Sequence, residues 1–117
     1  MVSSNKLSAK VKTILNDEPL IYVSTVSFWE ISVKYSLGKM ELNGGTPEDL
    51  YRASEKLRFR FLPLSEDDAA SFYKLEPLHK DTFDRLIIWQ AIKNNMILLS
   101  KDSWMSEYKK FGLDLIW

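Results

Sequence analysis

The segment from Asp81 to Asn94 constrains the fold of this chain more than any other. Its first turn carries two carboxylates, Asp81 and Asp84, and its body from Leu86 to Ile92 is apolar on nearly every face. A helix that is apolar on nearly every side has to be covered by other elements. The segment therefore predicts a buried helix of a globular protein, with acidic side chains at its amino-terminal end.

Length and composition are those of an ordinary globular protein. The chain has 117 residues, enough to bury one core, so residues 1–117 are expected to form a single domain. Sixteen basic and sixteen acidic residues cancel, which excludes a global field that attracts nucleic acid and leaves only local patches. The sequence contains no cysteine, no membrane-spanning apolar run and no secretory leader, so a cytoplasmic location is expected.

Helical and strand-like segments alternate along the chain. Short strands are predicted at 20–23, 59–64, 96–99 and 113–116, and helices at 6–16, 24–35, 46–57 and 81–94, with further helices opening at 65 and ending near 110. This alternation is typical of an α/β fold, a parallel sheet flanked by helices on both faces. Such folds usually open with a buried central strand, whereas this chain opens with polar residues and a helix. The sheet is therefore predicted to lack its first, central strand.

Acidic residues occur in apolar surroundings, or just beyond them, at three separate places. Glu30 lies within the apolar run 26–31, Asp81 and Asp84 open the buried helix, and Asp102 follows the strand at 96–99. Burying a carboxylate is costly unless it is paired, hydrogen-bonded or bound to a metal. These places together indicate an acidic metal pocket made by Glu30, Asp84 and Asp102, with Asp81 at its rim.

Each of these acids also has a purely structural interpretation. Asp81 can cap its helix, Asp84 can complete a capping box with it, and Asp102 can cap the helix that follows. Glu30 can pair with Lys34 one helical turn on, which is worth only about 0.2–0.5 kcal/mol and hardly offsets burial of a carboxylate. Capping does not exclude a role in a site, so both interpretations stay open for the aspartates.

Two cations beside these acids are candidate contacts for a substrate phosphate. Arg85 can either neutralise Asp84 or contact the phosphate, and Lys34 is a weaker candidate because surface lysines are usually only solvated. His79, the only histidine, has no partners at a metal-binding spacing and is interpreted as structural or as an aid to substrate contact. The sequence has no phosphate loop, nucleophile elbow or zinc-ligand spacing.

Several segments together resemble the PIN-domain toxins of bacterial type II toxin–antitoxin systems. The likeness extends from about Leu7 to Trp117, and the segments that carry it are 22–31 (YVSTVSFWEI), 37–40 (LGKM), 62–64 (LPL), 79–91 (HKDTFDRLIIWQA) and 98–102 (LLSKD). Each motif alone is modest, but their common order and spacing make the resemblance specific.

This resemblance implies a Mg²⁺- or Mn²⁺-dependent endoribonuclease that cuts RNA and is held in check by a cognate antitoxin protein. The family's pocket normally holds four carboxylates, of which Glu30 matches the second, Asp84 the third and Asp102 the fourth, with Asp81 as an additional acid. Carboxylate oxygens are the ligands that Mg²⁺ prefers, and the ion can neutralise a scissile phosphate and activate a water.

The chain departs from the family at its amino terminus. Relatives begin with a buried strand that ends in Asp-Thr and supplies the first catalytic aspartate, and Met1 to Ser4 fall where relatives are already past that strand. The sequence therefore predicts an incomplete or rearranged sheet, or one completed by a neighbouring chain, and little or no ribonuclease activity in this form.

The alternative function is that of a non-catalytic module that binds an antitoxin or another copy of itself. Surface left exposed where a strand is missing would favour such association. In either case a homodimer or higher oligomer is expected, formed by apolar surface of the first two helices that includes Phe28, Trp29 and Tyr35.

Overall fold

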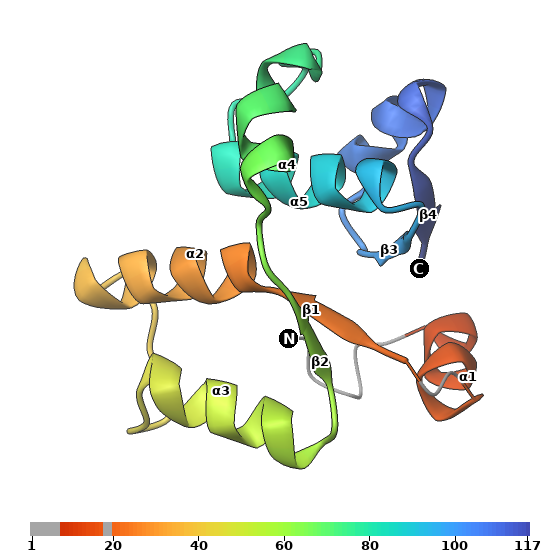
Figure 1. Cartoon of the computed structure of the whole chain (residues 1–117). Coiled ribbons are helices and arrows are strands. Elements are labelled where there is room, and N and C mark those ends of the chain that lie inside the picture. Colours follow the sequence, from red (N-terminus) through yellow and green to blue (C-terminus); the bar gives the residue numbers. More distant parts are fainter. Residues whose placement is uncertain (1–7, 18–19) are drawn as a thin grey trace.

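The computed structural model describes residues 8–17 and 20–117, and Figure 1 shows its helices and short strands. Their order is α1 (Ala9–Asp17), β1 (Tyr22–Ser24), α2 (Thr25–Ser36), α3 (Pro47–Lys56), β2 (Arg60–Leu62), α4 (Glu66–Ser71), η2 (Phe72–Lys74), α5 (Thr82–Lys93), β3 (Ile97–Leu99), η3 (Ser103–Phe111) and β4 (Asp114–Ile116). The alternation confirms the predicted α/β class. The start expected for the first helix, at residue 6, and the expectation for residues 1–4 lie outside the described residues.

The four strands form two separate parallel pairs. β1 pairs with β2, with Val23 opposite Phe61, and β3 pairs with β4, with Leu98 opposite Leu115. Within the described ranges no hydrogen-bonded ladder joins the two pairs, so the single parallel sheet expected from the sequence is replaced by two. The parallel direction follows from the helical crossovers that connect the paired strands. That a central strand is missing stays a prediction.

Three helices begin at side-chain caps that lie at positions 24, 46 and 65, where the sequence predicted helices to start. The hydroxyl of Ser24 accepts a hydrogen bond from the Val26 N–H, which starts α2 directly at the end of β1. Thr46 and Asp49 form a reciprocal capping box at the start of α3, and the Ser65 hydroxyl caps α4. Side-chain caps satisfy backbone N–H groups that a helix itself leaves without partners. These caps decide where each helix begins, and hence where Glu30 lies on α2.

The hydrophobic core lies around α5. Fully or nearly fully buried side chains from α5, η3 and the segments next to them pack together, namely Leu75, Ile88, Ala91, Met105, Tyr108 and Leu113. The buried Tyr108 hydroxyl donates to the Glu76 carbonyl at 2.8 Å and accepts from the Leu78 N–H at 2.9 Å. Both hydrogen bonds tie η3 to the loop that leads into α5. The core thereby holds the start of α5, where Asp81 and Asp84 lie.

The other half of the molecule is held by aromatic contacts and has fewer buried residues. Phe28 of α2, Tyr51 of α3 and Phe61 of β2 contact one another with ring centroids 5.2–6.0 Å apart. On α2 only Val26 is buried, whereas Trp29 and Leu37 are 53% and 61% exposed. α2 therefore packs mainly through Val26 and Phe28, while Trp29 and the C-capping residue Leu37 are exposed.

None of the helices in the described part of the chain has the length and apolar character needed to cross a membrane.

Candidate metal centre

Three carboxylates come together where α2 meets α5. Glu30 lies in the middle of α2, Asp84 in the first turn of α5, and Asp81 at the residue that caps α5. One oxygen from each can be chosen so that all three lie within 4.8 Å of one another, and all three residues are partly buried. The structure therefore brings Glu30 and Asp84 together, and it adds Asp81 as a full member of the group where the sequence placed it at the rim. We call these three residues the acidic cluster.

Capping and clustering coexist at Asp81. Its Oδ1 accepts a hydrogen bond from the Asp84 N–H at 3.1 Å, which caps α5. In a capping box, the Asp84 carboxylate would accept a hydrogen bond from the Asp81 N–H. Here the Asp81 N–H donates instead to Nδ1 of His79, at 3.2 Å. The carboxylate of Asp84 is therefore available to the acidic cluster.

Glu30 takes part in an ion pair as well as in the cluster. Its Oε2 lies 2.6 Å from Nζ of Lys34, one helical turn along α2. This hydrogen bond to Glu30, and then the charges of Glu30, Asp81 and Asp84, raise the pKa of Lys34. The pair with Lys34 that the sequence judged too weak to explain Glu30 is thus present together with the clustering that the sequence favoured. Lys34 acts as a counter-ion to the cluster, and its role in attracting a phosphate stays a prediction.

Asp84 is the most perturbed acid of the described residues. Burial raises the pKa of its carboxyl group to about 7, assisted by the negative charge of Asp81, that of Glu30, a hydrogen bond with Asp81 and the charge of Asp102. Crowded carboxylates cannot all ionise without a cation to offset their repulsion. A divalent ion would supply that compensation, and perturbed acids of this kind concentrate at functional sites.

Asp102 lies outside the acidic cluster. It precedes η3 in the position of a capping residue, but its side chain makes no capping hydrogen bond, and its backbone N–H donates to Oγ of Ser100. Its carboxylate is exposed and nevertheless contributes to the raised pKa of Asp84, so it is within electrostatic range of that group. Its expected place among the metal ligands stays a prediction.

The sequence left open whether Arg85 neutralises Asp84 or contacts a phosphate, and the structure places its side chain against α4 and η2. Its guanidinium lies over the ring of Phe72, with Cζ 5.0 Å from the ring centroid, and its buried Nε has no hydrogen-bond partner. Among the described residues the ion pairs involve other side chains. The reason is that successive helix residues point in different directions, so Arg85 reaches the α4–η2 side while Asp84 reaches α2. His79 stacks on Trp104 at 3.8 Å, as a structural role would require.

Sequence reasoning overlooked Gln90. This residue of α5 is 1% exposed, its Oε1 accepts a hydrogen bond from the Ser24 hydroxyl, and its Nε2 is 3.5 Å from the Leu62 carbonyl oxygen. It therefore ties the ends of both β1 and β2 to the helix that carries Asp81 and Asp84. The signal in the sequence was a lone amide inside an otherwise apolar helix, since buried polar groups need partners.

The donor set of the acidic cluster fits a hard divalent cation. Magnesium and manganese sites use carboxylate oxygens and retain several waters, so an open and partly solvated position suits them. Two shallow depressions lie elsewhere, at the loop 40–45, and none of the cluster's acids lines them. The candidate site is therefore marked by its acids and not by either of these depressions.

Comparisons with known proteins agree with this geometry. The family model for the PIN domain matches residues 1–110. No curated protein matches the chain. Because the family match covers nearly all of the 117 residues, the chain belongs to the PIN-domain family, whose members are typically metal-dependent nucleases.

Proposed function

We propose that this protein is an endoribonuclease that uses Mg²⁺ or Mn²⁺ to cleave phosphodiester bonds of RNA. The observation that carries the proposal is the convergence of Glu30, Asp81 and Asp84 within 4.8 Å, in a member of a largely nucleolytic family. The raised pKa of Asp84 supports it, because the cluster is electrostatically incomplete without a cation.

Each residue of the site has a chemical role in this proposal. Glu30, Asp81 and Asp84 would hold the metal, and Asp102 would contribute from the start of η3. The chemistry supplied at these residues by Mg²⁺ or Mn²⁺ would be neutralisation of charge on the scissile phosphate and a lowered pKa of a coordinated water. Lys34 attracts the phosphate, since its ammonium lies beside Glu30. Arg85 is a further candidate to contact the phosphate, and its guanidinium rests on the ring of Phe72.

We further propose that the protein is the toxin of a toxin–antitoxin pair, that it cleaves RNA in the cytoplasm, and that a cognate antitoxin protein is its partner. The support is the resemblance carried by residues 22–31, 79–91 and 98–102. Induced expression of the chain in a bacterial host should then slow growth, and the Asp84→Asn variant should not. Equal growth inhibition by both proteins would contradict the toxin role.

The nuclease proposal is tested by incubating a mixed-sequence RNA with purified protein and either Mn²⁺, Mg²⁺ or EDTA. We expect cleavage, however slow, that requires the metal and falls by about 100-fold or more in Asp84→Asn and Glu30→Gln, because each loses a metal ligand. Glu48→Gln is the matched control, since Glu48 is an exposed acid in the first turn of α3, outside the cluster. Because little activity is expected of this form, Mn²⁺ binding is measured beside cleavage and should weaken in Asp84→Asn and Glu30→Gln but not in Glu48→Gln. Cleavage that survives in Asp84→Asn, or Mn²⁺ binding that is the same in all of these proteins, would overturn the proposal.

A second function is favoured by the arrangement of the strands. Within residues 8–17 and 20–117, β1 and β3 each pair on one side only, and their residues Tyr22 and Ile97 are 40% and 56% exposed. Strand edges with exposed apolar side chains readily pair with another chain. The chain is therefore a candidate for a binding module that associates with a copy of itself, with or without nuclease activity.

A further inference from the structure

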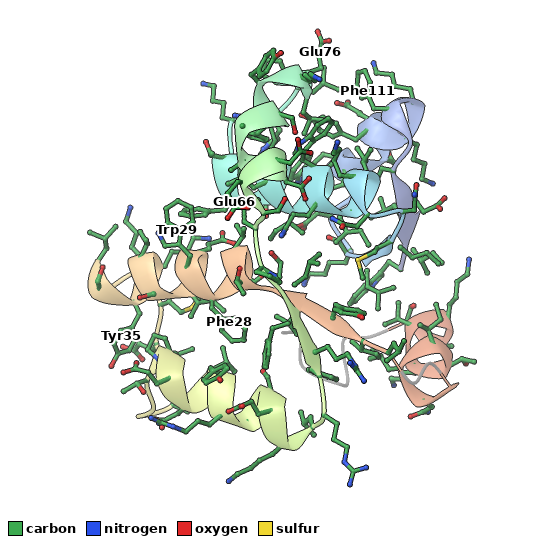
Figure 2. All side chains as sticks on the ribbon, viewed as in Figure 1. Phe28, Trp29, Tyr35, Glu66, Glu76 and Phe111 are labelled. Atoms are coloured by element: carbon green, nitrogen blue, oxygen red, sulfur yellow. The ribbon has the colours of Figure 1, made fainter. Side chains whose placement is uncertain are left out.

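Trp29 is prominent because it is exposed beside the acidic cluster. Its side chain is 53% exposed, although tryptophan is highly buried on average. It lies on α2 directly before Glu30, and Figure 2 shows its side chain on the side of α2 that faces α4 and α5. An exposed aromatic ring costs solvation free energy unless something covers it in the working state.

Phe83 holds this ring in place and leaves at least one of its faces open. The two ring centroids are 4.9 Å apart and the ring planes are at 88°. In an edge-to-face contact, either the edge of Phe83 touches one face of the indole, or the edge of the indole touches Phe83. In both cases Phe83 covers no more than one face of Trp29. A ring already held in one orientation also loses little conformational entropy when a ligand covers it.

We propose that the open face of Trp29 stacks on an unpaired base of the RNA, next to the phosphate that is cut. Trp29 precedes Glu30 on α2 and Phe83 precedes Asp84 on α5, so the aromatic pair and the acidic cluster share the same two helical turns. Every base presents a π-face, and aromatic platforms beside charged grooves are a general way to bind single strands. This inference rests on the proposed nuclease function and names one contact of its substrate, which requires that the contacted base be unpaired because a paired base within a duplex has no free face.

The charges around Trp29 favour a nucleotide over an apolar protein partner. The aromatic pair and the acidic cluster both lie where α2 meets α5, and a protein interface that covered this place would have to desolvate three carboxylates. A nucleotide brings a phosphate toward the metal and Lys34 while its base covers the indole. The same contact therefore satisfies both the charged and the apolar part of this surface.

The test combines Trp29→Leu with abasic substitutions in the RNA. A single-stranded RNA of ten nucleotides that the protein cuts is made with one abasic position at a time, and kcat/KM and the dissociation constant are measured with Mn²⁺. We expect Trp29→Leu to weaken binding of the intact RNA at least about fivefold, as loss of one stacked base does, and Trp29→Phe to retain most of it. At one position, an abasic substitution should weaken binding to the unmodified protein as much as Trp29→Leu weakens binding of the intact RNA. The same substitution should leave the dissociation constant of the Trp29→Leu variant unchanged.

Control variants distinguish base stacking by Trp29 from misfolding and from a contact between copies. Tyr73→Leu removes an aromatic side chain that is 81% exposed and lies outside the aromatic pair, and it should leave RNA binding unchanged. Thermal melting shows whether each variant is folded. If the unmodified protein and Trp29→Leu cleave the intact RNA and every abasic RNA with the same metal-dependent kcat/KM, the stacking role is overturned and the nuclease function stands. If Trp29→Leu changes the oligomeric state and no abasic position depends on Trp29, Trp29 forms a contact between copies instead. If the protein binds no RNA at all, both proposals are overturned.

Discussion

At the scale of single residues, Asp84 has the property that most distinguishes the site from a structural acidic cluster. Its carboxyl group has a pKa of about 7, raised first by burial and then by the charges around it. An unfolded chain would release this proton near pH 4. The folded protein therefore keeps a proton that the unfolded chain has lost over the range between about pH 4 and 7.

The consequence is a pH-dependent stability with a defined sign. Because the folded state binds more protons there, the contribution of Asp84 to the free energy of unfolding falls as the pH rises from about 4 to about 7. We expect the melting temperature of the unmodified protein in EDTA to fall, relative to Asp84→Asn, between pH 5 and pH 8. Mn²⁺ at pH 8 should restore it in the unmodified protein much more than in the variant. Melting curves that shift in parallel for both proteins would contradict the raised pKa of Asp84.

At the scale of elements, the site depends on how α2 and α5 are held against the ends of β1 and β2. Ser24 both caps α2 and donates its hydroxyl proton to Oε1 of Gln90 on α5. Gln90 in turn reaches the Leu62 carbonyl at the end of β2. This network connects the helix of Glu30 with the helix of Asp81 and Asp84, so we regard Gln90 as a positioning residue of the metal site.

Replacing Gln90 by Leu should have two measurable effects. The partly buried Ser24 hydroxyl loses its acceptor, so the free energy of unfolding in urea should fall by about 1–3 kcal/mol. Mn²⁺ should also bind more weakly, because α2 and α5 are no longer tied at this point. A double-mutant cycle with Ser24→Ala should give a coupling of about 0.5–3 kcal/mol. Ser36→Ala, at the far end of α2, is the matched control. If its coupling energy with Gln90→Leu is as large as that of Ser24→Ala, the network is refuted.

At the scale of the whole molecule, the structure consists of two strand pairs with a helical core around only one of them. The radius of gyration is 14.5 Å, compared with about 13 Å for a compact chain of this length. Isolated two-stranded sheets are marginally stable in water. The apolar residues at the edges of β1 and β3 therefore favour pairing with a further strand.

We expect this surface to produce concentration-dependent association of the purified protein. Ile97→Lys places a charge on the edge of β3, where its side chain is 56% exposed, and should shift the equilibrium toward monomer because charged edges resist pairing. Leu37→Lys is the matched variant on the exposed surface of α2, which the sequence favoured as the interface. Sedimentation equilibrium measures both. A protein that is monomeric at all concentrations would contradict self-association, and dissociation by Leu37→Lys alone would move the interface to the helices.

The sequence by itself determined the order of elements and most of their caps. Ser24, Thr46, Ser65 and Asp81 cap helices in the structure as predicted, because a side-chain cap depends on residues only two or three positions away. The buried nature of α5 could likewise be read from its apolar body. The family resemblance identified Glu30 and Asp84 as candidates before their proximity was known.

Only the tertiary structure decided how these elements meet. Asp81 joins Glu30 and Asp84 while Asp102 lies outside the cluster, Arg85 turns to Phe72, and Trp29 remains exposed. None of these outcomes depends on nearby sequence, because each is set by the angle and spacing at which α2, α5 and η3 pack. The division of the strands into two pairs has the same origin, since a hydrogen-bonded ladder requires two edges to approach within about 5 Å. Local chemistry could predict which aspartates lie at the start of a helix, and long-range packing decided which acids come together.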